Sequence, residues 1–411
     1  MKEPANDQPS SCTVRFVTKL PEVVPDQGLA VPSTLSVDGL SDLVNHLVDQ
    51  DSPIDYDFLI EGEFLRTSLA DYITAANLSF ESVLTLEYTH RHPAPEPESR
   101  LPHPDWISCL AITGSVIYTG CYDNTIRQWT SSSDKPQRQL IVHTGPVKCL
   151  AVSSTTLLTG SKDNTVRLWS LDDMSPIAIG SQHDDSVESV AFCPSRQDLF
   201  VSGSWHHTIR LWGVGKGRAA PVVKKSKSKR GSETTQTALI ERSCLSNVHS
   251  QTVSDLCWPD ADTIYSVSWD RTLCRIDVNE GTVVQTRTLT DAASSVAFSS
   301  SANLIAVGHA DRAVRLYDPR LPGAPAKLLR GHQGWVSDLA WAPGSATMLA
   351  SSSYDCTLKV WDVRSTTPLH TLKADTGAAG AKTLCVDWSK DGVIACGGTD
   401  GQLRLHRSKA C

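Results

Sequence analysis

Several features that would indicate common protein classes are missing from this 411-residue chain. No apolar run reaches about 18 residues, so we expect no membrane-spanning helix, and the first residues (MKEPANDQPSSCTVRF) lack the apolar core of a signal peptide. The 12 cysteines form no Cys-x-x-Cys pair, which favours buried free thiols in a reducing compartment over disulfides or zinc. Gly-x-Ser-x-Gly, a Walker-type glycine loop, His-Glu-x-x-His and a Cys/His nucleophile context are absent too, so we predict a protein that is not an enzyme and has no cofactor of its own.

The chain has instead one short pattern that occurs seven times. Each copy combines small residues, a turn residue and an alternating apolar stretch that ends near Trp, as in Gly160–Trp169 (GSKDNTVRLW). The turn residues are Asp123, Asp163, His206, Asp270, Asp311, Asp355 and Asp400, at spacings of 40, 43, 64, 41, 44 and 45 residues. This period is typical of WD-repeat blades. We therefore predict an all-β, seven-bladed propeller that holds other macromolecules.

A histidine lies about twenty residues before most of the turns and is followed four residues later by a β-branched residue. These histidines are His103, His143, His183, His249 and His332. In WD-repeat proteins such a His bonds to the turn Asp, so we expect structural rather than metal-binding histidines. The third blade has His206 in place of Asp, and the fifth and seventh lack the upstream His, so we expect these three blades to be held less firmly. We assign Trp129, Trp169, Trp212 and Trp361 to the core.

Ring closure requires a strand from outside the repeats. The last repeat ends near Arg407 and the chain ends at Cys411, which leaves no outer strand for the seventh blade. We expect this clasp strand within Arg91–His103, and its prolines predict that it is short and imperfect. The predicted organisation is a disordered N-terminus (1–12), a ubiquitin-like domain (13–90), a linker with the clasp strand (91–105), and the propeller (106–411), which contains a basic insertion at about 213–245.

The N-terminal segment predicts a small α+β domain. Strands are expected at 13–18, around Val31 and Leu35, at 57–60 and at 84–88, with helices at Val37–Val48 and from Ser68. The order ββαββαβ resembles ubiquitin. Residues 1–100 carry a net charge of −11 and residues 101–411 one of +4. An acidic module suits a basic or metal-bearing protein partner and argues against nucleic-acid binding by that domain.

The N-terminal stretch FLIEGEFLRTSLADY, followed by seven WD repeats, resembles the WD-repeat ribosome-biogenesis factors that carry an NLE-type N-terminal domain. The resemblance implies membership of the Pescadillo complex, which is required for rRNA processing in the large subunit. The implied partners are Pescadillo-type and block-of-proliferation-type proteins, a dynein-related AAA ATPase and the pre-ribosomal particle, with rRNA as a further contact and no membrane. The implied locations are the nucleus, nucleolus and nucleoplasm.

The same resemblance assigns a role to Glu81. In the family, an acidic residue between the second helix and the last strand completes the coordination of a divalent metal held by the ATPase's metal-adhesion domain. Glu81 in LSFESVLTLEY occupies the matching position. A hard cation such as Mg²⁺ favours a carboxylate oxygen. Read without the family, Glu81 is a solvated loop residue.

Two further sets of residues are candidates for partner binding. The insertion contains a basic run in PVVKKSKSKRGSE, for which we predict nuclear import or RNA contact, the alternative being a solvated loop. Its charged residues are Lys224, Lys225, Lys227, Lys229 and Arg230. The residues that directly precede four of the turns are aromatic and are expected on one face, either as interface anchors or as packing between blades. They are Tyr122, Trp205, Trp269 and Tyr354.

An alternative function comes from Trp361-Asp362-Val363-Arg364. This tetrapeptide matches the WDxR element of substrate receptors of cullin-type ubiquitin ligases. It also arises as ordinary blade sequence, and it does not account for the N-terminal domain.

Overall fold

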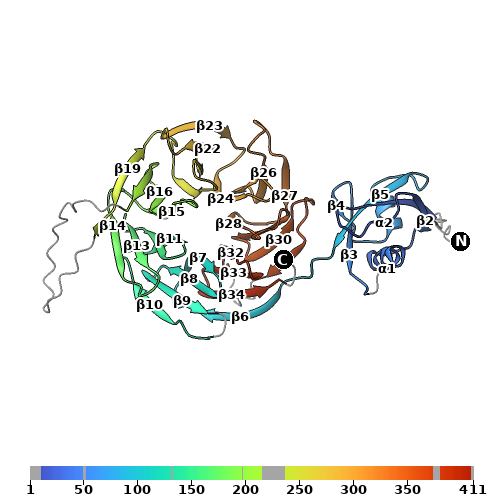
Figure 1. Ribbon diagram of the computed structural model, residues 1–411, viewed down its shortest axis with the longest axis horizontal. Coiled ribbons are helices and arrows are strands. Elements are labelled where there is room, and N and C mark those ends of the chain that lie inside the picture. Colours follow the sequence, from blue (N-terminus) through green and yellow to red (C-terminus); the bar gives the residue numbers. More distant parts are fainter. Residues whose placement is uncertain are drawn as a thin grey trace. The chain divides into compact units, whose positions relative to one another are not determined.

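The computed structural model describes residues 11–49, 52–130, 133–196, 198–214, 237–373 and 380–408. The chain divides into two compact units, the first of which spans Met1–Pro93, while the second contains most of the remaining residues (Figure 1). Each unit is described separately below.

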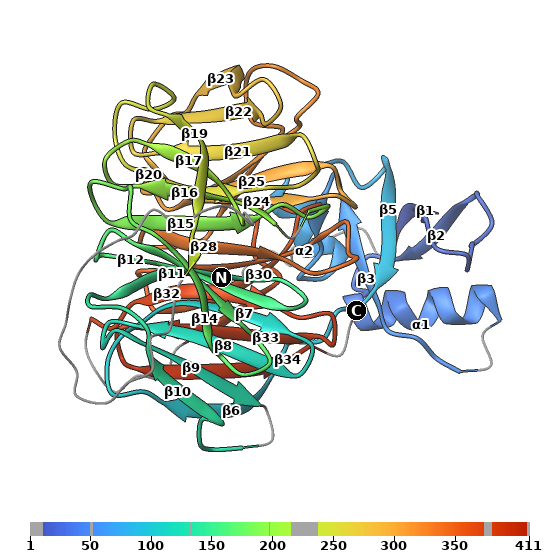
Figure 2. The same ribbon diagram turned by 60° about the vertical axis from the view of Figure 1, so that its left-hand side comes forward.

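The first unit is a five-stranded mixed sheet with two helices (Figure 2). Its elements are β1 (Ser11–Val17), β2 (Gly28–Pro32), α1 (Val37–Val48), β3 (Tyr56–Ile60), β4 (Glu63–Phe64), α2 (Leu69–Ala75) and β5 (Val83–His90). The sheet order is β2-β1-β5-β3-β4, and β1 runs parallel to β5. The predicted order ββαββαβ is confirmed, although β2 ends before Leu35, which lies in the turn that leads into α1.

The two helices start where the sequence supplies caps. Ser36 accepts a hydrogen bond from the backbone of Gly39, and Ser68 accepts one from Asp71, so each helix has a side-chain partner for an otherwise unpaired N–H group. The apolar face of α1 buries Leu40 and Val44 against the sheet. The result is a separate hydrophobic core for the N-terminal domain.

The second unit consists of seven sheets in a ring around a central channel (Figure 1). The first blade has β7 (Ile107–Thr113), β8 (Val116–Cys121), β9 (Thr125–Thr130) and β10 (Arg138–Ile141). The second has β11 (Val147–Val152), β12 (Thr156–Ser161), β13 (Val166–Ser170) and β14 (Pro176–Gly180). The third has β15 (Val187–Phe192), β16 (Leu199–Ser204), β17 (Ile209–Gly213) and β19 (Ile240–Leu245). The fourth has β20 (Val253–Cys257), β21 (Thr263–Ser268), β22 (Thr272–Asp277) and β23 (Thr282–Thr288).

The remaining blades follow the same plan. The fifth has β24 (Ala293–Ser299), β25 (Leu304–His309), β26 (Ala313–Tyr317) and β27 (Lys327–Arg330). The sixth has β28 (Val336–Trp341), β29 (Met348–Ser353), β30 (Thr357–Asp362) and β31 (His370–Lys373). The seventh has β32 (Thr383–Trp388), β33 (Val393–Gly398), β34 (Gln402–Arg407) and β6 (Glu96–Pro102). The seven-bladed all-β architecture is thus as predicted.

The strand β6 closes the ring. It pairs antiparallel with β34, and Leu101, only 1% exposed, lies opposite Leu403 in a shared apolar cluster. The pairing has one register shift, between Leu405 and His406, so the predicted irregularity is present. The predicted shortness is wrong, because β6 has seven residues and β10, β27 and β31 have four each. As the outermost strand of its blade, β6 has a free edge, where proline's missing N–H costs no ladder hydrogen bond.

Hydrogen bonds from buried histidines hold several blades together. His143, His249 and His332 each bond through Nδ1 to the turn aspartate, at 3.0–3.2 Å. Burial alone would raise the pKa of Asp163, but its hydrogen bonds to His143 bring that pKa well below the ordinary value. The imidazole of His143 also contacts Thr159 through Nε2, and the Thr159 hydroxyl accepts the indole N–H of Trp169. These histidines are structural, as expected.

The other blades use different contacts. His103 contacts Thr119 and the Leu101 carbonyl instead of Asp123, so the expected His–Asp bond is wrong in the first blade. Asp123 pairs with Arg127 four residues later, and the same pairing joins Asp311 to Arg315 and Asp400 to Arg404. In the third blade His183 bonds to Ser202 and Thr208. The fifth and seventh blades therefore replace the missing histidine contact with a half-buried or buried ion pair.

Candidate partner-binding sites

Glu81 lies on an exposed turn between α2 and β5, where the sequence analysis expects it. Two serines fix the turn: the backbone N–H of Glu81 donates to Ser79 Oγ at 3.2 Å, and Ser82 Oγ donates to the Ser79 carbonyl at 2.6 Å. Within the described part of the chain, the Glu81 carboxylate has no hydrogen-bond or ion-pair partner. An unpaired, exposed carboxylate on a braced turn suits coordination of a hard cation supplied from outside.

A hollow of about 490 Å³ borders this turn on the N-terminal domain. Its lining includes Leu59–Gly62 at the end of β3 and Ser82–Thr85 at the start of β5. Val83 is 56% exposed here. The turn that carries Glu81 is therefore flanked by an apolar surface that a docking protein could cover.

On the propeller, one repeated backbone hydrogen bond places the residues that precede the turns. In every blade the N–H of that residue donates to a carbonyl in the loop leading into the innermost strand, for example Tyr122 to Trp106 and Tyr354 to Trp335. The residue after each turn residue has a positive φ, between 55° and 72°. Because the turn geometry repeats, the residues that precede the turns gather around one mouth of the channel, as predicted.

Five aromatic side chains form a rim around this mouth and line a cavity of about 520 Å³. This aromatic rim comprises Tyr122, Trp205, Trp269, Trp335 and Tyr354. The rings of Trp205 and Trp269 meet edge to face at 5.2 Å, and those of Trp335 and Tyr354 stack at 5.8 Å. The predicted alternatives, interface anchor and packing between blades, both have support, since the rings contact one another and yet Trp205 and Trp269 remain 42% and 41% exposed.

Two exposed tryptophans near this mouth were not predicted from the sequence, and of these Trp335 belongs to the rim whereas Trp106 is not among the residues that line the cavity. Trp335 is 51% exposed at the rim, and Trp106, 45% exposed, lies beside Tyr122 at 5.2 Å. Both follow a blade histidine by three residues, as His103-x-x-Trp106 and His332-x-x-Trp335. The spacing His-x-x-Trp could have revealed both tryptophans. It places Trp in the loop before an innermost strand, where a backbone carbonyl accepts the repeated hydrogen bond.

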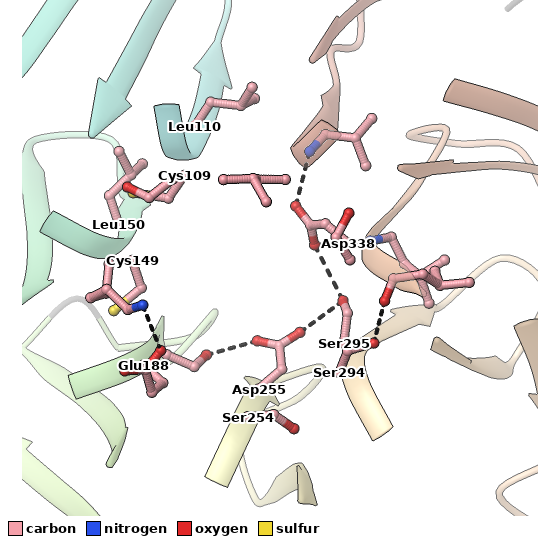
Figure 3. A pocket seen from close by; sticks show the side chains of 18 of the residues that line it. Cys109, Leu110, Cys149, Leu150, Glu188, Ser254, Asp255, Ser294, Ser295 and Asp338 are labelled. Atoms are coloured by element: carbon pink, nitrogen blue, oxygen red, sulfur yellow. Dashed lines mark hydrogen bonds and ion pairs between the residues drawn. The ribbon is translucent and has the colours of Figure 1, made fainter. Parts of the chain in front are cut away.

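Seven equivalent positions of the innermost strands form a layer below the rim, and all of them except Cys385 line the cavity. Each follows the register shift in an innermost strand. The residues of this channel layer are Cys109, Cys149, Ser189, Asp255, Ser295, Asp338 and Cys385. Figure 3 shows Asp255, Ser295 and Asp338 side by side on the wall. Ser189 and Ser295 donate to Asp255 at 2.8 and 3.0 Å, and Ser295 also lies 3.2 Å from Asp338.

The channel layer carries unusual electrostatics. Burial raises the pKa of Asp255, and burial together with the nearby Asp255 charge raises the pKa of Asp338 to about 7. A hydroxyl has one hydrogen, so Ser295 can donate to only one of the two carboxylates at a time. A proton or another positive charge near Asp338 relieves the repulsion between them.

The described ranges contain no group of three or more His, Cys, Asp or Glu residues placed to hold a metal ion. Nor does any helix in those ranges have the length and apolar character needed to cross a membrane. All 11 cysteines in the described ranges are free, as expected. Seven of them are buried, including Cys149 and Cys385, but Cys109, Cys257 and Cys356 are half-buried and Cys244 is exposed, so the expectation of buried thiols holds only in part.

The basic residues Lys224, Lys225, Lys227, Lys229 and Arg230 lie outside the described residues. The structure describes two strands within the range predicted for the insertion. β18 (Thr237–Ala238) pairs with β14 of the second blade, and β19 is the outer strand of the third blade. The expected range of about 213–245 for the insertion was therefore too wide at its C-terminal end.

The first two residues of the WDxR element lie in the interior of the sixth blade, whereas Val363 and Arg364 are half-buried. Trp361 and Asp362 are fully buried, and the indole N–H of Trp361 donates to Ser351 Oγ at 2.7 Å. Trp129, Trp169 and Trp212 are likewise buried, so the core assignment of all four tryptophans is confirmed. Ordinary blade packing accounts for the Trp and Asp of this tetrapeptide.

Known proteins match both units. The NLE (NUC135) domain family matches residues 12–73, and the WD domain, G-beta repeat, matches residues 96–130, 134–170, 174–213, 283–318, 323–362 and 366–407. "Ribosome biogenesis protein WDR12 homolog" of Nematostella vectensis is 34% identical over 418 residues, which cover 96% of this chain and 98% of that protein. The protein of the same name from Oryza sativa subsp. japonica is 34% identical over 429 residues, 97% of each chain. The chain belongs to this family of ribosome biogenesis proteins.

The family match and the structure differ at one blade. The repeats matched to the WD domain leave out the stretch between residues 213 and 283. The structure has a complete fourth blade there, β20 to β23, in which His249 Nδ1 contacts Asp270 at 3.2 Å and Thr272 at 2.8 Å. The seven-blade count from the turn residues therefore holds in this member of the family.

Proposed function

We propose that this protein is a non-catalytic assembly factor of the large ribosomal subunit, required for pre-rRNA processing in the nucleolus and nucleoplasm. Its propeller holds Pescadillo-type and block-of-proliferation-type proteins on the pre-ribosomal particle. The similarity to ribosome biogenesis proteins carries this proposal, because it extends over 96% of the chain and so includes both domains. A propeller alone would support many functions.

The propeller's part in this function rests on the aromatic rim. Large aromatic side chains that remain exposed at the centre of a surface are typical anchors of protein interfaces. Three tryptophans of the rim are between 41% and 51% exposed. The rim lies on a rigid scaffold, because each of its residues takes part in the repeated backbone hydrogen bond that joins a turn to the loop leading into an innermost strand.

The N-terminal, ubiquitin-like domain has a separate role in the proposal. Glu81 docks this domain on a dynein-related AAA ATPase by completing the coordination of a divalent cation, such as Mg²⁺, held in the ATPase's metal-adhesion domain. Hydrolysis of ATP then releases the factor from the pre-ribosome. The exposed, unpaired carboxylate and the serine-braced turn support this role. The acidic character of residues 1–100 favours approach to a cationic site.

Substitution of Glu81 tests the docking step. We expect both Glu81→Ala and Glu81→Asp to weaken binding to the purified metal-adhesion domain, because the first removes the ligand and the second shortens its reach. The free energy of unfolding should change by no more than about 0.5 kcal/mol, as is usual for substitutions at surface positions. Binding should also be lost on addition of a chelator.

Asp42→Ala is the matched control. Asp42 is an exposed carboxylate of the same domain on α1, so its removal lowers the negative charge equally without touching the turn. In cells, the Glu81 variants should still enter pre-ribosomes and fail to leave. Wild-type binding by Glu81→Ala in metal-replete buffer would exclude the role of Glu81, and absence of the protein from purified pre-ribosomal particles would exclude the function as a whole.

A further inference from the structure

The rings of the aromatic rim present their faces to cations, and the chain itself supplies two of those cations. Lys148 Nζ lies 5.4 Å from the centre of the Tyr122 ring, and Lys382 Nζ lies 4.4 Å from that of Tyr354. Such positions are favourable because the face of an aromatic ring carries partial negative charge. Among the described residues, no such cation covers Trp205 or Trp269.

Charged groups of both signs lie beside this tryptophan pair. Asp184 and Asp185 are exposed in the loop that leads into β15, and the Trp205 N–H donates to the carbonyl of Ser186 in the same loop. Glu188, on β15, lines the cavity and pairs with Lys148 at 3.4 Å. Two further positive residues lie on the neighbouring turns, Arg271 directly after Asp270 and the exposed Lys162 at the position in the second blade that is equivalent to Trp205. In the lining of the cavity itself, however, four carboxyl groups stand against one lysine, Lys148, so the wall of the mouth is acidic; they belong to Glu188, Asp255, Asp338 and Asp387.

The carboxyl groups of the channel layer add to the negative charge of the mouth. Asp255 lines the cavity beneath the pair and accepts hydrogen bonds from two serines, one on each neighbouring blade. Asp338 shares the Ser295 hydroxyl with Asp255, and only one of the two carboxyl groups can receive that hydrogen at a time (Figure 3). A positive group in the mouth would compensate these charges in a partly desolvated space, where electrostatic attraction is stronger than in water.

We propose that the Trp205–Trp269 side of the channel mouth receives an arginine or lysine side chain from a partner protein. The charge complementarity selects a basic segment over an acidic or purely apolar one. The cavity of about 520 Å³ has room for such a side chain. This inference rests on the proposed function, since it names the chemistry by which the propeller recognises one of its partners.

Short peptides bound to the full-length protein provide the test. The probes are a seven-residue Gly/Ser peptide with a central Arg and four variants of it with Lys, citrulline, Leu or Glu at the central position. The affinity of each peptide is measured by calorimetry at two salt concentrations. We expect the Arg and Lys peptides to bind and the citrulline peptide, which lacks the charge, to bind about tenfold more weakly than the Arg peptide. Trp205→Leu or Trp269→Leu should weaken the affinity for the Arg peptide about thirtyfold, the loss seen at interface hot spots.

Trp106→Leu is the matched control. Trp106 is equally exposed, and its neighbour Tyr122 already has Lys148 over its ring, so this variant should bind the Arg peptide like wild type. Equal binding of the Leu and Arg peptides, or binding that Trp205→Leu leaves unchanged, would overturn the inference. The second result would point to general attraction by the acidic N-terminal domain. Trp205→Leu protein that binds no peptide yet still purifies with pre-ribosomal particles would support the site and show that the proposed function does not depend on it alone.

Discussion

Substitution of Leu101 measures how much the clasp strand stabilises the propeller. Leu101 is 1% exposed and packs between the first and seventh blades with Ile107, Leu403 and Leu405. Replacing a leucine in such a position by alanine costs about 3 kcal/mol, from lost burial and the cavity that remains. Unfolding entropy is about 2.1 cal/mol/K per residue, or about 0.65 kcal/mol/K for a unit of about 310 residues, so Leu101→Ala should lower Tm by about 5 °C.

Leu329→Ala supplies the comparison. Leu329 is fully buried on β27, the outer strand of the fifth blade, and faces Val314 as Leu101 faces Leu403. The fifth blade is made from one continuous piece of chain, whereas the seventh joins strands separated by about 300 residues of sequence, a closure that costs more conformational entropy. Both variants should show the same loss by calorimetry. A shift below about 1 °C for Leu101→Ala, with the full shift for Leu329→Ala, would show that β6 does not seal the ring in solution.

Two further predictions concern the channel and the insertion. The pKa of Asp338 is raised from 3.8 to about 7, so between these values the folded chain keeps a proton that the unfolded chain has lost, and the free energy of unfolding falls as pH rises. Asp338→Asn should remove this slope, worth about 2 kcal/mol between pH 5 and 7 in urea titrations; an unchanged slope would assign it to other groups. Deletion of Lys224–Arg230 should reduce nuclear accumulation, measured by fluorescence of a tagged protein, without changing Tm. Unchanged nuclear fluorescence would instead indicate import on a partner.

The sequence by itself determined the number and kind of blades. The turn residues recur at a nearly constant spacing, and period-2 alternation follows each of them, so local pattern was sufficient. It also indicated the N-terminal elements, because Ser36 and Ser68 cap the helices where the apolar periodicity starts. The sequence also indicated that a strand from before the first repeat completes the seventh blade, because the seventh repeat lacks an outer strand of its own.

Only the tertiary structure decided how the blades are held and where the surfaces meet. The replacement of His–Asp bonds by Asp–Arg pairs depends on a side chain four residues beyond the turn reaching back to it. Asp255 joins Ser189 and Ser295 because each innermost strand lies beside its neighbours around the channel. Trp335 meets Tyr354 within the sixth blade, where β28 pairs with β29. These contacts link residues from 19 to 66 positions apart, and no local pattern specifies which side chains the ring brings together.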